Sequence, residues 1–138
     1  MKKIIIGDHI TKSFGKGDEQ RNVLDDVSVE INEGEFVAIM GPSGSGKSTL
    51  MFALSGMDDV NSGKVLFEDT DLSVMGENEL SDIRRTKMGF VFQQPTMLKN
   101  LNIIDNIILP VMREKKKNAT AISEKARILM KRVGIAEL

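Results

Sequence analysis

A short stretch of glycine, hydroxyl and lysine residues is the part of the sequence best suited to chemistry. It runs from Gly41 to Thr49 and reads GPSGSGKST. Glycines at this spacing let successive backbone N–H groups point into one hollow, which binds anionic oxygens without help from side chains. The pattern, with Lys and Ser directly after the last glycine, predicts a phosphate-binding loop for a nucleoside triphosphate.

Two side chains at the end of this stretch complete the expected site. Lys47 would place a positive charge against the outer phosphates, and the Ser48 hydroxyl would bind the Mg²⁺ ion that accompanies them. The residues expected to contact the nucleotide here are Gly41, Ser43, Gly44, Ser45, Gly46, Lys47, Ser48 and Thr49.

Such a loop works only when a strand and a helix position it. The unbroken apolar run from Phe36 to Met40 predicts a buried strand before the loop, and residues 49–54 can continue as a helix after it. The helix N-terminus then adds its own unpaired N–H groups and dipole to the anion site. We therefore expect a strand, loop and helix in this order.

Composition limits the class of protein. With 138 residues and 41% hydrophobic content, the chain can bury one ordinary core, so we expect a single domain. The net charge of −1 argues against a nucleic-acid partner, and the absence of Cys excludes disulfides and thiolate metal sites. The lone His9 is expected to be an exposed turn residue. No apolar run reaches the roughly 20 residues of a membrane span, and the one after Met1 ends too early for a secretory signal, so we expect a soluble cytoplasmic chain.

Alternation and turn residues predict strands on both sides of the loop. Residues 4–14, 27–31 and 64–68 read as strands, the first ending at Phe14 before a glycine-rich turn. Because the chain has no Tyr or Trp, a base could stack only on a Phe, and Phe14 lies at a strand end. Phe14 is therefore either a base-stacking residue or a core residue at the end of a strand.

The predicted helices are amphipathic or capped. The phosphate-loop helix should end near Ser55-Gly56, and residues 78–85 form a helix with Leu80 and Ile83 on one face. Arg84 and Arg85 are either phosphate ligands or a solvated helix end.

The C-terminal third combines a short strand, a glutamine and two helices. Residues 90–92 predict a strand that delivers Gln93 into a loop, where its amide could reach a metal ion or its water. Asn102 should cap a helix that Pro110 bends or ends, and its isoleucines are either core or a surface for a partner. A basic run, 113–117, reads as a linker, and Asn118 should cap a last helix. The apolar face expected for that helix is Ile122, Ala126, Leu129 and Val133.

Two classes of phosphate-loop protein fit poorly. GTP-binding switches need Asn-Lys-x-Asp and Asp-x-x-Gly motifs, and neither occurs in the sequence. A small-molecule kinase would need an acceptor site, which we do not find in the sequence.

Residues 34–40 leading into the loop, residues 83–85 and residues 89–94 together resemble the nucleotide-binding subunit of an ABC transporter. The likeness is strongest to the subfamily of macrolide and antimicrobial-peptide exporters and lipoprotein-release ATPases. The resemblance implies an α/β fold of the P-loop NTPase type, with residues 1–138 as the N-terminal portion of the domain, an antiparallel β subdomain and an incomplete core sheet. It also implies that ATP and Mg²⁺ are the cofactors and that the subunit powers export of a substrate across the cytoplasmic membrane.

The resemblance also assigns roles to individual residues. Phe14 falls at the aromatic position that stacks on adenine, although the family usually has Tyr there. Gln93 falls at the glutamine that senses Mg²⁺ and the γ-phosphate, so Ser48 and Gln93 are the expected metal ligands. The segment from Gln94 to Leu109 resembles the surface that receives a transmembrane permease subunit, which would hold the chain at the inner face of the cell membrane.

Three family motifs do not occur in the printed residues: the Leu-Ser-Gly-Gly-Gln signature, an apolar strand ending in Asp-Glu, and a switch histidine. Residues 54–57 imitate only the first letters of the signature. We therefore nominate no catalytic residue and expect this polypeptide alone to bind ATP without turning it over. Unpaired strand edges should favour a homo-oligomer or an exchanged dimer. The alternative function is a non-hydrolysing regulatory module that pairs with a full-length subunit.

Overall fold

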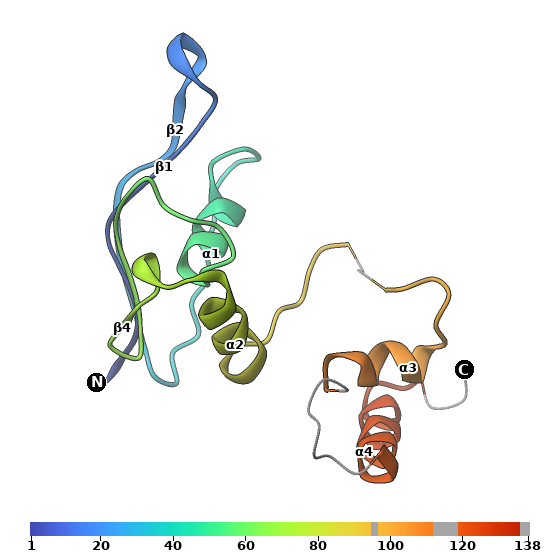
Figure 1. Cartoon of the computed structure of the whole chain (residues 1–138). Coiled ribbons are helices and arrows are strands. Elements are labelled where there is room, and N and C mark those ends of the chain that lie inside the picture. Colours follow the sequence, from blue (N-terminus) through green and yellow to red (C-terminus); the bar gives the residue numbers. More distant parts are fainter. Residues whose placement is uncertain (95–96, 112–118, 136–138) are drawn as a thin grey trace. The chain divides into compact units, whose positions relative to one another are not determined.

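The computed structural model describes residues 1–94, 97–111 and 119–135 (Figure 1). The chain divides into two compact units, Met1–Gly89 and Phe90–Leu138. The basic run 113–117 and the cap expected at Asn118 lie outside the described residues.

The first unit is built on a four-stranded antiparallel sheet. Its strands are β1 (Lys3–Phe14), β2 (Arg21–Asn32), β3 (Ser62–Phe67) and β4 (Thr70–Asp71), in the spatial order β2-β1-β3-β4. A one-turn helix, η1 (Gly17–Glu19), joins the first two strands at the predicted turn. The expected strands 4–14, 27–31 and 64–68 and the antiparallel subdomain are thus confirmed.

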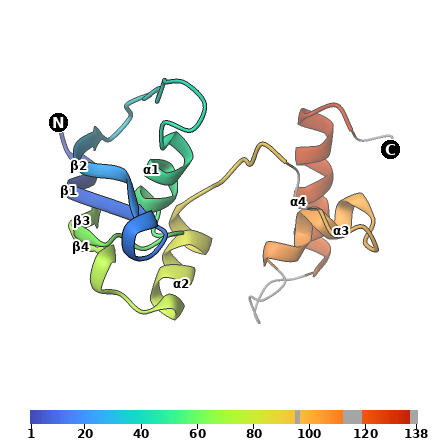
Figure 2. The same ribbon diagram turned by 90° about the horizontal axis from the view of Figure 1, so that it is seen from above.

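Two helices cover one face of this sheet (Figure 2). They are α1 (Lys47–Leu54) and α2 (Glu77–Lys87), and the short helix η2 (Leu72–Val74) precedes α2. Leu80 and Ile83 of α2 pack against the core, as their spacing predicted. The buried core consists of Ile10, Leu24, Ala53, Leu54, Val65, Phe67 and Leu72.

The apolar run before the phosphate loop is not a strand in this structure. Residues 36–40 make no ladder with any described strand, and Phe36 and Met40 are 98% and 88% exposed. The prediction of a buried strand was therefore wrong for this chain. A strand is stabilised by hydrogen bonds to a neighbour and by burial, and the described residues place no strand beside this run.

The second unit consists of two helices and their connections. They are α3 (Ile103–Ile108), followed by η3 (Leu109–Val111), and α4 (Ala119–Arg132). The predicted cap is confirmed, because the Asn102 side chain accepts a hydrogen bond from the Asp105 N–H at 2.8 Å. None of the described helices has the length and apolar character that crossing a bilayer would require.

Two predictions for this unit were wrong. Residues 90–92 form no strand, and Val91 is 98% exposed. As with residues 36–40, the described residues place no strand beside them. On α4, the buried side chains are Ala126 and Met130, whereas Leu129 and Val133 are exposed. The buried face thus continues from Ile122 at a spacing of four residues. Leu129, which is three residues after Ala126, is exposed instead.

An exposed pair on the first unit should make stability depend on pH. His9 Nδ1 lies 2.6 Å from Asp26 Oδ1. The hydrogen bond to Asp26, with the charges of Asp26 and Asp8, raises the pKa of His9 above its ordinary value of 6.5.

Because the pKa of His9 is raised in the folded state, the stabilisation is complete below its ordinary pKa and is lost as pH rises through the folded pKa. We expect a slightly higher urea midpoint at about pH 6 than at about pH 8.5. His9→Gln should remove this difference, and Asp26→Asn should reduce it. An equal pH dependence in His9→Gln would show that another group is responsible.

Candidate nucleotide-binding site

The phosphate-binding stretch ends in a glycine that the structure requires. Gly46 has φ +86°, in the left-handed region, and forms the N-cap of α1. A Cβ at this position would lie 2.8 Å from the Val23 carbonyl oxygen of β2. Both the backbone angle and the available space therefore demand glycine here, and the loop can approach β2 closely.

The start of α1 suits an anion. Gly46 supplies no side-chain cap, and the first bond closing the helix runs from the Leu50 N–H to the Gly46 carbonyl at 2.8 Å. The N–H groups of the first turn consequently have no acceptor within the helix, and the helix dipole favours negative charge at this end. The donor set therefore fits phosphate.

Lys47 adds a cation at the loop. Its ammonium donates a hydrogen bond to the Pro42 carbonyl at 2.6 Å and lies 3.5 Å from Ser45 Oγ. The side chain therefore curves back over residues 42–45 instead of extending into solvent. The carboxylates of the described residues form no ion pair with it, so its charge is available to an anionic ligand.

The remaining loop residues complete the turn that leads into α1. The Ser45 N–H donates to the Pro42 carbonyl at 3.3 Å, which closes a turn within the loop. Ser48 is exposed in the first turn of α1, and Thr49 beside it is half-buried. The eight residues that the sequence predicted between Gly41 and Thr49 lie in this loop and in the first turn of α1: Gly41, Ser43, Gly44, Ser45, Gly46, Lys47, Ser48 and Thr49.

Phe14 lies at the end of β1 and pairs with Arg21 of β2. The phosphate loop contacts β2, since Gly46 lies against Val23 and Leu24 of that strand. Arg21 and Leu24 are three residues apart, or about 10 Å along a strand. Phe14 is 49% exposed and is not part of the core cluster, which favours the base-stacking interpretation over the core one.

Lys12 lies beside Phe14, and sequence reasoning did not single it out. Its ammonium lies 5.3 Å from the centre of the Phe14 ring, and its side chain is only 8% exposed. Burial by itself would lower the pKa of Lys12, but the hydrogen bonds and charges of Asp58 and Asp59 outweigh burial and raise the pKa. One feature of the sequence could have indicated this burial. Lys12 is two positions after Ile10, and residues two apart in a strand lie on the same face.

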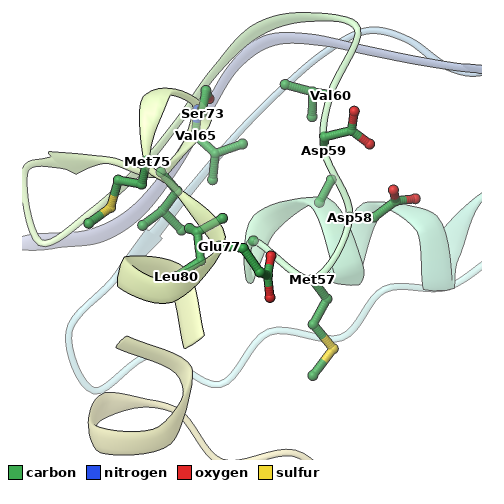
Figure 3. A pocket seen from close by; sticks show the side chains of 12 residues that line it. Met57, Asp58, Asp59, Val60, Val65, Ser73, Met75, Glu77 and Leu80 are labelled. Carbon is green, nitrogen blue, oxygen red and sulfur yellow. The ribbon is translucent and has the colours of Figure 1, made fainter. Parts of the chain in front are cut away.

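A separate cavity of about 150 Å³ lies between the end of α1, β3, η2 and α2 (Figure 3). Its lining includes the acidic residues Asp58, Asp59 and Glu77 and apolar side chains such as Met75 and Leu80, and no residue of the phosphate loop. Carboxylates repel phosphate, so we do not assign the nucleotide to this cavity.

Gln93 belongs to the second unit, where it is exposed. In the segment that follows, the Asn106 side chain bonds the Leu98, Leu101 and Asn102 carbonyls and accepts from the Leu98 N–H, which fixes the approach to α3. A groove of about 370 Å³ separates α3 from α4, with a mainly apolar lining of Ile107, Ile108, Val111, Ala121, Ile122, Lys125, Ala126 and Leu129.

Comparison with known proteins gives a consistent result. Residues 24–138 match the family described as ABC transporter. The lipoprotein-releasing system ATP-binding protein LolD of Buchnera aphidicola subsp. Schizaphis graminum is 38% identical over 125 residues, which is 91% of this chain and 54% of that protein.

Solved structures agree with this match. The fold is similar to the ATP-binding cassette MJ0796 in a dimeric post-hydrolysis state bound to ADP and Pi, with a TM-score of 0.88 and 33% identity. It is also similar to a second dimeric structure of MJ0796, described as a bacterial ABC transporter cassette, with a TM-score of 0.88 and 34% identity. Both comparisons cover 95% of this chain and 57% of the other, so the chain spans little more than half the length of the proteins it matches.

Proposed function

This chain belongs to the ABC transporter family, and we propose that it binds Mg-ATP at residues 41–49 as the ATP-binding part of a transporter subunit. The proposal is carried by three groups of the first unit that suit a nucleotide. These groups are the uncapped N-terminus of α1, the ammonium of Lys47 and the exposed ring of Phe14. They suit a phosphate chain and a base on a single ligand.

Each group then has a distinct role. The N–H groups of the loop and of the first turn of α1 hold the phosphate oxygens, and Lys47 neutralises the outer phosphates. The Ser48 hydroxyl supplies one oxygen ligand to magnesium, which contributes the charge neutralisation that brings the phosphates together. Phe14 stacks on adenine and orients the base relative to the loop.

The roles of Gln93 and of its neighbours rest on the family resemblance. We propose Gln93 as a further magnesium ligand and the segment Gln94–Leu109 as the surface that contacts a transmembrane permease subunit. The exposed Met97, Leu98 and Leu109 give this segment apolar contact area, which supports the second part. The chain would then lie at the inner face of the membrane and take part in exporting a substrate.

Self-association is proposed on separate grounds. The apolar run 36–40 is exposed and pairs with no described strand, and exposed apolar segments with the composition of a strand can pair with another chain. The MJ0796 cassette has been described as a dimer, which supports a homo-oligomer or an exchanged dimer for this chain.

Calorimetric titration of the chain with Mg-ATP tests the proposed function. We expect saturable binding that weakens when EDTA removes magnesium, and weaker binding of tripolyphosphate, which has no base. Absence of ATP binding by the folded chain would refute the proposal.

The same samples test whether residues 1–138 turn ATP over. We expect no steady phosphate release, because positioning the attacking water needs groups that we do not find in these residues. Steady release that disappears in a Lys47→Ala variant would contradict this expectation, whereas release that persists in the variant would indicate a contaminating ATPase.

A further inference from the structure

The best-buried charge described in the first unit lies beside the proposed base-stacking residue. Lys12 Nζ donates three hydrogen bonds, each 2.7 Å long, to Asp58 Oδ1, Asp59 Oδ1 and the Asp59 carbonyl oxygen. An ammonium has three protons, so every donor of Lys12 is used. A long, flexible side chain is thereby held in one position.

The acceptors of Lys12 are fixed to the phosphate-loop helix. The N–H groups of Met57 and Asp58 both donate to the Phe52 carbonyl of α1, at 2.9 and 3.2 Å. Asp58 and Asp59 therefore continue the C-terminal end of α1, in the connection that leads to Val60 (Figure 3). The end of α1 is thus bonded directly to the backbone of Asp58, and Asp59 follows it in the chain.

The same connection also forms hydrogen bonds with the backbone of β1 on both sides of Lys12. The Asn61 N–H donates to the Thr11 carbonyl at 2.8 Å, and the Ser13 N–H donates to Asn61 Oδ1 at 2.7 Å. Together with the Lys12 ion pairs, these bonds fasten the strand end before Phe14 to the end of α1. The phosphate loop lies at the other end of that helix.

Phe14 contacts Lys12 and is also partly exposed. The Lys12 ammonium lies 5.3 Å from the ring centre, within the range of a cation–π contact, and 49% of the residue is exposed. A cation held over a ring restricts how the ring turns, while the exposed part of Phe14 remains accessible to a base. The contact therefore orders the ring before a ligand arrives.

From these contacts we propose that Lys12 is a positioning residue for the purine base of the nucleotide. It sets the orientation of the Phe14 ring and ties that ring, through Asp58 and Asp59, to the helix that begins at the phosphate loop. The inference rests on the proposed nucleotide site, and its consequence is selective: losing Lys12 weakens contacts to the base and leaves contacts to the phosphates intact.

Two titrations separate positioning from general stability, one with Mg-ATP and one with tripolyphosphate plus magnesium. We expect Lys12→Met to weaken ATP binding by about three- to tenfold and to leave tripolyphosphate binding unchanged. Lys12→Arg, which keeps a cation with several donors, should restore most of the ATP affinity. Lys3→Met is the matched control, since Lys3 is also on β1 but forms only an exposed ion pair with Glu30, and it should change neither affinity.

A double-mutant cycle connects Lys12 with the ring. Phe14→Leu should produce the same base-selective loss, and adding Lys12→Met to it should cause little further loss. Asp58→Asn keeps an oxygen acceptor but removes one charge, and it should weaken ATP binding by about twofold to threefold. This milder variant provides the measurement if Lys12→Met, which leaves two carboxylates facing each other, does not fold.

The outcomes are distinguishable. Equal losses for ATP and tripolyphosphate, or additive losses in the cycle, would overturn the positioning role and leave only a structural one. An unchanged ATP affinity in Phe14→Leu would also overturn it, while the proposed phosphate site would stand. A wild-type chain that binds neither ligand would overturn the proposed function and this inference together.

Discussion

Lys47→Ala is expected to lower the affinity of the chain for Mg-ATP by about 100-fold, or about 3 kcal/mol. The reason is that the Lys47 ammonium already lies over residues 42–45, where the phosphates would bind, and the described carboxylates do not neutralise it. Moving it from the Pro42 carbonyl to a phosphate oxygen needs only side-chain rotation. Calorimetry with Mg-ATP measures the loss directly.

The fold should survive this substitution, because the bonds lost are to the loop itself and none reaches the core. The urea midpoint of Lys47→Ala should therefore match that of the wild type. Lys64→Ala, which removes an exposed lysine of β3, is the matched control and should leave ATP affinity unchanged. If Lys47→Ala bound Mg-ATP with wild-type affinity, Lys47 would not be part of the nucleotide site.

The phosphate loop could be predicted from sequence because its geometry is local. Gly46 must take a left-handed φ and approach the Val23 carbonyl, and the residues that follow begin a helix without any side-chain cap. The left-handed φ and the helix start depend on neighbouring residues in the chain, so a short pattern encodes them, whereas the contact with Val23 joins residues far apart in sequence. The antiparallel strands were equally predictable, since alternation along 27–31 directly reflects one buried face.

The predictions that failed concern interactions with distant residues. The runs 36–40 and 90–92 have the composition of buried strands, yet a strand also requires a neighbour, and composition does not identify one. Lys12 was missed for a related reason. Its partners Asp58 and Asp59 lie 46 and 47 residues away along the chain, so no local pattern connects them to the strand.

The second large effect that we expect is structural and concerns Gly63 of β3. A Cβ at this position would lie 2.4 Å from the His9 carbonyl oxygen and 2.6 Å from that of Asp8, and φ is +88°. The pairing of β1 with β3 is irregular between Asp8 and Thr11, so the glycine sits where β1 bulges toward its neighbour. Here Gly63→Ala combines an unfavourable left-handed φ with a collision against backbone that has little freedom to move.

We expect Gly63→Ala to reduce the free energy of unfolding by roughly 2–5 kcal/mol, as the sum of the left-handed penalty and overpacking. Gly34→Ala separates these two terms, because Gly34 also has a left-handed φ of +76° but a Cβ there would meet no atom within 4 Å. Its loss should be about 1–2 kcal/mol. Urea unfolding of both variants gives the difference, which measures the close approach of β1 and β3. Equal losses would mean that the bulge adjusts to a methyl group, and the contacts of Thr11 and Lys12 with the end of α1 would then be less rigid than the structure indicates.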